Sequence, residues 1–265
     1  YPKLVGGFTR QCEETAARFY QAALHFDERS DLKRPNGVWQ LGSCEAAELA
    51  KLAETTYRDV NIALSNQFAI YAERHSIDIH DVIEACNSQP FSHIHTPGIA
   101  VGGHCIPVYP HLYLHGDPTA DLVRTARDLN KSMPSLAVAR MCDEVGPLQG
   151  KTVLILGIAY RGGVRETAYS GAYDIRDALV ESGADVVVHD PLYTDADLGS
   201  LGFVPYETGL PVDYAILHTE HEEYQPWAYE WGHGASVILD GRGFLVADDW
   251  PSARIIRIGS DSDLS

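Results

Sequence analysis

The sequence has few basic residues and no compensating basic patch. Lys and Arg number 20 against 37 Asp and Glu, which gives a formal net charge of −17 at pH 7. Such a chain is not expected to bind polyanions in general, which excludes nucleic acid as a partner. A single anionic small molecule can still bind where arginine side chains and backbone amides gather.

Paired cysteines and metal-binding patterns are missing as well. The five cysteines are scattered and form no C-x-x-C pair. This argues against a disulfide framework or a zinc cluster and favours a reducing cytoplasm. Histidines gather in the middle of the chain, but their spacings match no zinc pattern, so we expect no metal. They are His93, His95, His104, His111 and His115.

Long hydrophobic runs are absent. Charge interrupts every apolar stretch well before the length of about 18 residues that a membrane span needs, so no span is predicted. No signal peptide is visible, but the sequence begins with Tyr1 rather than Met, which leaves targeting open. With 265 residues, 45% of them hydrophobic, the chain can form one large domain or two ordinary ones.

Helical periodicity dominates the first half, from about residue 11 to residue 145. Apolar side chains at helical spacing predict one long helix over residues 44–75, and Ile77–Ala85 predicts a short one. Residues 119–145 predict a second long helix, interrupted near Pro134. The first half is therefore expected to be mainly helical.

Short apolar strands alternate with helices in the second half, beyond a domain boundary expected at Gly146–Gly150. This alternation is typical of an α/β doubly wound parallel sheet. Ligands of such sheets bind beyond the carboxyl ends of the strands, here near Gly157–Gly163 and Asp190. Strands are expected at 152–156, 185–190, 214–217, 236–240 and 254–258, with a helix at 173–182.

One loop carries a cysteine directly after two glycines, in Gly102-Gly103-His104-Cys105-Ile106-Pro107. Glycine permits positive φ and close approach of a substrate, and proline stiffens the exit from the turn. A thiol on such a loop can lie near backbone N–H groups that stabilise a thiolate or an oxyanion. The residues alone leave two interpretations open, a nucleophile and a small residue that fills a tight turn.

The segment Gly157–Gly162 follows the first expected strand. It matches G-x-G-x-x-G only if Ala159 replaces the middle glycine, which is a weak dinucleotide signal. Arg161 and Arg165 favour an anion such as a diphosphate, because a guanidinium group binds phosphate in a bidentate way. Surface arginines on a structural turn are the alternative.

Four separated segments together resemble the UDP-glucose/GDP-mannose dehydrogenase family, in particular its UDP-N-acetylmannosamine branch. These enzymes oxidise a UDP-sugar to the uronic acid. The resemblance implies the end of an N-terminal NAD domain at 1–10, a central helical domain at 11–146 that dimerises through the two long helices, and a Rossmann-like UDP-sugar-binding domain at 147–265. The segments are Ala47–Ala63, Pro97–Pro110, Ala126–Pro134, and Val153–Ser170 with Val188–Pro191.

The resemblance also implies a reaction with NAD as cofactor. NAD takes hydride from the C6 alcohol, the Cys105 thiolate attacks the resulting aldehyde, and a second hydride transfer gives a thioester that water cleaves. Lys51 matches the family lysine that stabilises the oxyanion, and His104 is expected to stabilise the loop or the thiolate. The residues implied to bind substrate are Gly98, Gly102, Gly103, His104, Arg161 and Arg165.

Two catalytic positions depart from the family pattern. Thr55 stands where asparagine is usual and Tyr109 stands where an aspartate is usual, so the water that cleaves the thioester loses a carboxylate. Two alternatives therefore stay open, a catalytically weakened sugar-nucleotide-binding protein and an enzyme that stops at the aldehyde. Because the family's NAD domain would precede Tyr1, the chain by itself is expected to be inactive.

Overall fold

The computed structural model describes residues 1–225, 234–246, 250 and 253–260. It divides into two compact units, Tyr1–Tyr57 and Arg58–Ser265, and each is described by itself. Within the described ranges, none of the helices combines the length and the apolar character that crossing a membrane requires.

The first unit contains a small parallel sheet. Its strands are β1 (Lys3–Val5) and β2 (Val38–Gln40), and α1 (Arg10–Ala23) lies between them in the sequence. The Thr9 hydroxyl caps α1 by accepting a hydrogen bond from the Cys12 N–H. A strand at β2 was not expected within a helical first half, because three residues are too short to display a period of two.

Helices dominate the chain up to Val145, as the periodicity predicted. The two long ones are α2 (Cys44–Glu73) and α5 (Asp121–Val145), and α3 (Ile79–Asn87) is the short helix expected after the first. The eight-residue helix α4 (Tyr109–Gly116) was not predicted. The predicted interruption of the second long helix is wrong, since α5 runs without a break through Pro134. Proline removes one backbone hydrogen bond, but Met133 and Ala137 beside it are buried in the core, and this packing keeps the helix continuous.

The second half forms a five-stranded sheet in the order β4-β3-β5-β6-β7, with every pair parallel. All five strands predicted from the apolar runs are present. Their bounds are β3 (Thr152–Leu156), β4 (Asp185–His189), β5 (Tyr214–Leu217), β6 (Val237–Asp240) and β7 (Arg254–Arg257), with helices α6 (Ala172–Glu181) and α7 (Asp195–Ser200) and the 3₁₀ turn η1 (Glu222–Tyr224) between strands. The predicted α/β fold with a parallel sheet is confirmed.

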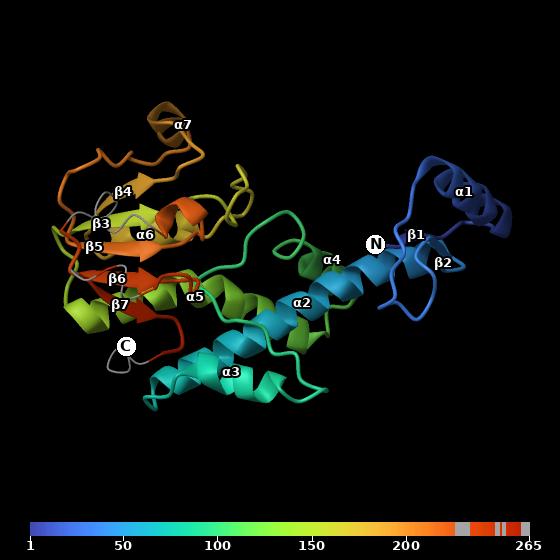
Figure 1. The fold of residues 1–265 in the computed structure, drawn as a ribbon, viewed down its shortest axis with the longest axis horizontal. Coiled ribbons are helices and arrows are strands. Elements are labelled where there is room, and N and C mark those ends of the chain that lie inside the picture. Colours follow the sequence, from blue (N-terminus) through green and yellow to red (C-terminus); the bar gives the residue numbers. More distant parts are fainter. Residues whose placement is uncertain (226–233, 247–249, 251–252, 261–265) are drawn as a thin grey trace. The chain divides into compact units, whose positions relative to one another are not determined.

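Both faces of the sheet are buried. Helices α5 and α6 lie against one face (Figure 1), where Val153 and Ile155 of β3 join the core. Leu154 and Leu156 point to the other face, into a second core around Tyr224. Burial on both sides explains why the strands read as continuous apolar runs. Because β3 lies between β4 and β5, the carboxyl ends of β3 and β5 flank the point where the strand order reverses, and ligands of open α/β sheets bind at such points.

Candidate active site

A cavity of about 560 Å³ lies beyond the carboxyl ends of β3, β5 and β6. One wall is the loop at residues 96–106, hereafter the Cys105 loop; the other comes from the loops that follow these strands. The cavity brings together most of the predicted site residues of the second unit. Those that line it are Gly98, Gly102, Gly103, His104, Cys105 and Arg161.

Cys105 is a half-buried free thiol on the cavity wall. Its carbonyl oxygen accepts hydrogen bonds from the N–H groups of Val108 and Tyr109, at distances of 3.2 and 2.9 Å. The Cys105 loop therefore passes directly into the first turn of α4. Tyr109 begins that helix and is not among the residues that line the cavity, so a role for its hydroxyl stays a prediction.

The two glycines before His104 let the Cys105 loop pack tightly against another part of the protein. A Cβ on Gly102 would lie 2.7 Å from Tyr160 Cβ and 3.0 Å from the Tyr169 carbonyl oxygen. Gly103 has φ +94° and donates its N–H to the Ala168 carbonyl at 2.8 Å. The close approach that glycine permits here is thus to Tyr160 and to the segment that leads into α6.

His104 connects the two walls of the cavity. Its Nε2 lies 3.2 Å from Glu166 Oε2, and the two side chains are 68% and 43% exposed. The hydrogen bond from His104 lowers the pKa of the Glu166 carboxyl. An exposed pair of this kind contributes little to folding, so it orients the His104 ring more than it stabilises the loop.

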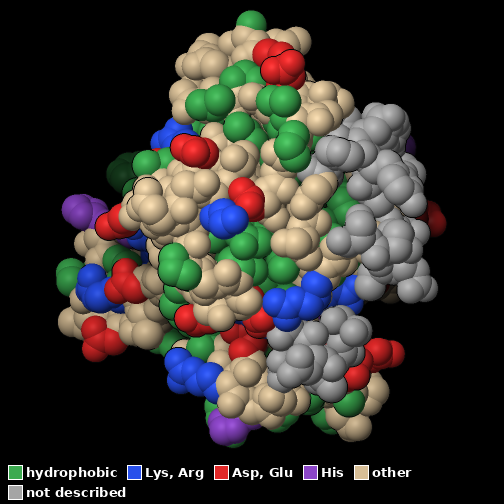
Figure 2. Space-filling view, turned by 90° about the vertical axis from the view of Figure 1, so that its left-hand side faces the viewer, with side chains coloured by type: hydrophobic (Ala, Val, Ile, Leu, Met, Phe, Trp, Pro, Cys, Tyr) green, Lys and Arg blue, Asp and Glu red, His purple; other side chains and the backbone are tan. Residues whose placement is uncertain are grey.

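Three arginines line the cavity against a single acidic residue, Glu220. They are Arg58, Arg161 and Arg242. On the face shown in Figure 2, by contrast, Lys and Arg side chains lie singly or in small groups among Asp and Glu. The cavity is therefore a local positive site on an acidic chain, and it suits an anionic small molecule.

Arg242 was missed by the sequence analysis. Its Nε donates to the His218 carbonyl at 2.7 Å and its NH1 donates to the Ala100 carbonyl at 3.0 Å, while Glu220 Oε2 lies 3.4 Å from Nε. Burial lowers the pKa of this guanidinium, although Glu220 opposes the shift. The signal that could have found it is Gly241-Arg242-Gly243, directly after a predicted strand at the carboxyl edge.

Arg165 does not line the cavity. Its Nε donates to the Leu192 carbonyl at 2.9 Å, and its NH2 lies 2.8 Å from Asp197 Oδ2. The side chain thus ties the loop after β3 to the segment that follows β4. The pairing with Asp197, in the first turn of α7, was not visible in the sequence.

The loop after β3 is held by residues that directly follow β5. Thr219 donates to the Ala159 carbonyl at 2.6 Å, and Glu220 and His221 accept the N–H groups of Gly162 and Gly163, both at 3.2 Å. Each interaction joins a backbone group of one loop to a side chain of the other. The register of β3 beside β5 therefore fixes the loop that carries Arg161.

Asp190, at the end of β4, holds the start of the same loop. Its Oδ2 accepts the N–H groups of Ile158 and Ala159, at 2.8 and 3.1 Å, and lies 3.2 Å from His221 Nε2. Burial alone would raise the pKa of this carboxyl, but these hydrogen bonds lower it overall.

The loop after β3 does not fit a dinucleotide. In a dinucleotide fold, free backbone N–H groups of this first loop and a helix that starts at once hold the diphosphate. Here Asp190, Glu220 and His221 already accept those N–H groups, and α6 begins only at Ala172. The weak G-x-G-x-x-G resemblance is a structural turn, and NAD has no cradle on it.

Lys51 and Thr55 belong to the unit Tyr1–Tyr57, so they are described apart from the cavity. Lys51 Nζ lies 2.9 Å from Glu54 Oε2 on the exposed surface of α2. The buried Thr55 hydroxyl donates to the Lys51 carbonyl at 2.8 Å. Its proton is thus directed at its own helix.

No group of three or more His, Cys, Asp and Glu side chains suited to a metal ion occurs among the described residues. All five cysteines are free thiols.

The parallel sheet and its cavity define a class of protein: an α/β protein with an arginine-lined ligand site beside a cysteine loop. Two family models identify the family. The central-domain model of the UDP-glucose/GDP-mannose dehydrogenase family matches residues 45–132, and its UDP-binding-domain model matches residues 154–247. Together they match more than half of the sequence, and the chain belongs to this family.

Named relatives agree with this assignment. The chain is 35% identical to a UDP-N-acetyl-D-mannosamine dehydrogenase of Methanocaldococcus jannaschii, over 94% of this chain and 56% of that protein. It is 32% identical to the Pyrococcus horikoshii enzyme of the same name, over 92% of this chain and 56% of that protein. The chain thus spans little more than half the length of these relatives.

Solved structures show the same fold. The UDP-D-ManNAc dehydrogenase of Pyrococcus horikoshii gives a TM-score of 0.77 at 27% identity, covering 98% of this chain and 60% of that one. The UDP-N-acetyl-mannosamine dehydrogenase of Staphylococcus aureus gives a TM-score of 0.77 at 28% identity, covering 99% of this chain and 59% of that one.

Proposed function

We propose that this chain carries the sugar-nucleotide site and the thiol nucleophile of an NAD-dependent UDP-sugar 6-dehydrogenase. One observation carries the proposal: the half-buried Cys105 thiol and three arginines line a single cavity at the carboxyl edge of a parallel sheet. The names of the relatives point to UDP-N-acetyl-D-mannosamine as the substrate. In this scheme NAD serves as hydride acceptor, and no described loop supplies its cradle.

The cationic wall would bind the diphosphate. Arg161 extends from the loop that Asp190 and the residues after β5 hold in place. Arg242 is fixed by two carbonyl groups and lines the same cavity. A guanidinium pair of this kind matches phosphate oxygens in charge and in geometry. Arg165, which contacts Asp197, would act indirectly, by holding the loop that carries Arg161.

The opposite wall would carry the chemistry. The Cys105 thiolate would add to the C6 aldehyde and form a hemithioacetal, whose hydride would pass to NAD to leave a thioester on Cys105. Water would hydrolyse the thioester to the uronic acid and restore the thiol. Lys51 would stabilise the oxyanion, and Thr55 and Tyr109 would take the positions that usually orient the water. Gly98, Gly102 and Gly103 line the cavity and would serve substrate binding indirectly, because the space beside their Cα atoms is taken by Arg242 and Tyr160.

Assembly and location belong to the same proposal. Leu64, Phe68 and Tyr71 are exposed apolar side chains at helical spacing on α2, and a second copy of the chain would cover them in a dimer. Free thiols throughout suit the cytoplasm. The division into segments 1–10, 11–146 and 147–265 is proposed on the family pattern.

Calorimetric titration of this chain with UDP-N-acetylmannosamine and with UDP-glucose tests the binding site. Arg161→Gln should weaken binding roughly tenfold or more, because it removes charge-assisted hydrogen bonds. The control Arg176→Gln should bind as the wild type. Arg176 lies on α6, donates to Asp177 and to the Gly202 carbonyl, and is not among the residues that line the cavity. Equal affinities in both variants, or no binding by the wild type, would refute the proposed site.

The Thr55 geometry favours a second candidate, a catalytically weakened sugar-nucleotide-binding protein in which cleavage of the thioester is slow. Its hydroxyl proton is already donated to the Lys51 carbonyl, which leaves only an acceptor for the hydrolytic water. The chain joined to an NAD-binding domain distinguishes the two. Continued turnover with two NADH per sugar supports the full oxidation, whereas a burst of two NADH per chain that leaves a thioester on Cys105, found by mass spectrometry, supports the second candidate. One NADH per sugar and an aldehyde trapped by hydroxylamine would instead show an enzyme that stops at the aldehyde.

A further inference from the structure

We propose that four buried polar side chains, Asp59, Asn66, Arg127 and Asn130, are positioning residues that fix both ends of the Cys105 loop. The inference rests on the proposed function only in giving Cys105 a task. The hydrogen bonds themselves, and the test below, require neither turnover nor a bound sugar nucleotide.

The first end of the Cys105 loop is held by α2 and α5 together. The Gly98 N–H donates to Asn66 Oδ1 at 2.9 Å. Asn66 Nδ2 donates in turn to Asn130 Oδ1 at 2.9 Å, which joins α2 to α5. Asn130 Nδ2 then donates to the backbone carbonyl and to Oδ1 of Asp59, at 2.9 and 2.8 Å.

The second end of the loop meets the same network. Arg127 NH1 lies 2.7 Å from Asp59 Oδ1 and 3.3 Å from the Ile106 carbonyl oxygen, so one donor group faces both. A continuous path of hydrogen bonds therefore runs from Gly98, through the two helices, to Ile106. Cys105 lies one residue before the end of this path.

Stability alone is a poor reason for such a network. Asp59 and Asn66 are 0% exposed, Asn130 is 1% exposed and Arg127 is 6% exposed. Asp59 Oδ2 has no hydrogen-bond partner among the described residues. Apolar residues of similar volume often stabilise a core as well as a buried ion pair does, or better. What this network adds is a defined geometry at two backbone groups of one loop.

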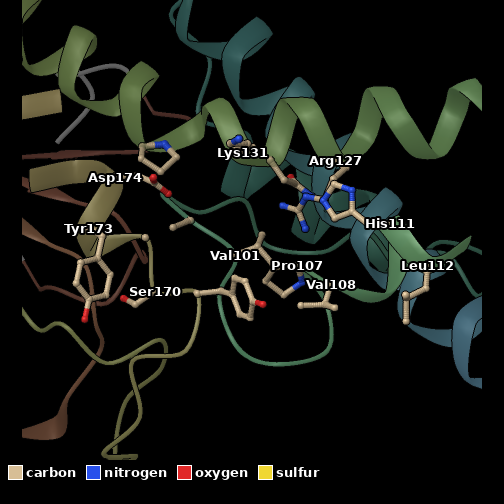
Figure 3. A pocket seen from close by; sticks show the side chains of 15 residues that line it. Val101, Pro107, Val108, His111, Leu112, Arg127, Lys131, Ser170, Tyr173 and Asp174 are labelled. Carbon is tan, nitrogen blue, oxygen red and sulfur yellow. The ribbon is translucent and has the colours of Figure 1, made fainter. Parts of the chain in front are cut away.

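The loop needs these anchors because part of its inner side is not packed. A second cavity of about 520 Å³ lies beside it, lined by Val101 of the loop, by Pro107 directly after the loop, and by Arg127 and Asn130 of α5. Figure 3 shows this cavity, with Arg127 and Lys131 entering from α5. The network at the ends of the loop therefore adds to the hydrogen bonds at its middle, where Arg242 donates to the Ala100 carbonyl and Gly103 donates to the Ala168 carbonyl.

The same two helices provide a matched control. Arg140 of α5 pairs with Glu73 of α2 and also donates to the Ser260 carbonyl, and Glu73 accepts the Gly259 N–H. This second arginine–carboxylate pair thus joins the helices to the exit of β7 and makes no contact with the Cys105 loop in the interactions described. Each of these two arginines of α5 pairs with a carboxylate of α2 and donates to one backbone carbonyl. For Arg127 that carbonyl belongs to the Cys105 loop, and for Arg140 it belongs to Ser260.

The test measures the rate at which iodoacetamide alkylates Cys105 in this chain, by peptide mass spectrometry, in Arg127→Met, Asn66→Ala and Arg140→Met. Cys142 on α5 serves as the internal reference thiol. Asn66→Ala and Arg127→Met should each raise the Cys105 rate about tenfold, since losing a buried hydrogen bond shifts the loop equilibrium by such a factor. The Cys142 rate should stay unchanged, and Arg127→Lys should restore the wild-type rate.

Arg140→Met should lower the urea midpoint and leave the Cys105 rate unchanged. The inference is overturned if folded Asn66→Ala and Arg127→Met alkylate at the wild-type rate. It is equally overturned if Cys105 and Cys142 accelerate together, which is the mark of a general loosening. Titration with UDP-N-acetylmannosamine tests the proposed function separately from the anchoring of the loop. If the chain binds no sugar nucleotide, Arg127→Met can still raise the alkylation rate of Cys105 while Arg140→Met leaves it unchanged.

Discussion

The two loops that line the cavity are held in different ways. The Cys105 loop forms hydrogen bonds with side chains on two helices, α2 and α5, and with Arg242 at the exit of β6. The loop after β3, residues 157–166, is held by residues that directly follow the adjacent strands β4 and β5. Sheet register therefore positions Arg161, whereas the packing of helices against the sheet positions Cys105.

Under the proposed function, this difference separates the wall that would bind the diphosphate from the wall that would carry the thiol. Damage to the interactions of the loop after β3 removes buried hydrogen bonds at the centre of the sheet, so it should lower global stability. Substitutions in the network that anchors the Cys105 loop should change the alkylation rate of the Cys105 thiol more than they change global stability. Four expected outcomes follow for the two walls and for the contacts between them.

The largest effect is expected from Asp190→Ala. The substitution leaves the N–H groups of Ile158, Ala159 and Leu192 without their acceptor in a buried site, which should cost about 3–5 kcal/mol of unfolding free energy. Urea unfolding measures it. Asp213→Ala is the control, since that carboxylate also accepts a backbone N–H, from Thr152, but at the exposed amino edge of the sheet, and it should lose much less. Equal losses would contradict this account of the β3 loop.

Lowering the pH should destabilise the same region through two histidines. Burial lowers the pKa of His218 to about 3 and that of His189 to about 4. The unfolded chain binds both protons near pH 6.5 while the folded chain does not, so stability is lost as the pH falls from about 6.5 towards 4. At about pH 5 the loss is about 2 kcal/mol for His218 and less for the partly exposed His189.

Urea midpoints at about pH 7.5 and about pH 5 test this pH dependence. His189→Gln should reduce the decline, and the exposed His75→Gln should leave it unchanged. A wild-type urea midpoint that is the same at both pH values would contradict this prediction, because it would mean that the folded chain binds these protons as readily as the unfolded chain.

A smaller effect is expected where the two walls touch. Gly102→Ala places a Cβ 2.7 Å from Tyr160 Cβ and 3.0 Å from a backbone oxygen, so the Cys105 loop must move. We expect a loss of about 1–3 kcal/mol in unfolding free energy and a faster alkylation of Cys105. Gly116→Ala is the control, because no atom lies within 4 Å of its Cβ position. If Gly102→Ala has the stability and the Cys105 alkylation rate of the wild type, then Tyr160 accommodates the added methyl group without a shift of the Cys105 loop.

The sheet could be predicted from the sequence because its strands are buried on both faces and read as continuous apolar runs. The Cys105 loop could be singled out because two adjacent glycines precede His104 and Cys105. The residues that anchor this loop could not be predicted. Asn66, Arg127 and Asn130 are polar residues within helices, which sequence patterns assign to a solvated face. They are buried because α2 and α5 contact each other through these side chains and because the Cys105 loop contacts the same residues.

Arg242 escaped prediction for a related reason. Its role depends on the carbonyl groups of His218 and Ala100, which come from a neighbouring strand and from the far loop. Pro134 shows the opposite error, because a residue that breaks helices locally is tolerated once its neighbours are packed in the core. In each case a tertiary contact decides the outcome, and no local pattern contains it.

The smallest effect is expected from the side-chain pair of His104 and Glu166, which joins the two walls. Both are exposed, so His104→Gln should leave the urea midpoint unchanged within error. If this pair only orients the ring, the Cys105 alkylation rate should also stay within about twofold of the wild type. A tenfold change in that rate would mean that His104, rather than the buried network, controls the thiol. Glu166→Gln is the matched variant, since it keeps the shape and removes the charge, and it should behave like His104→Gln.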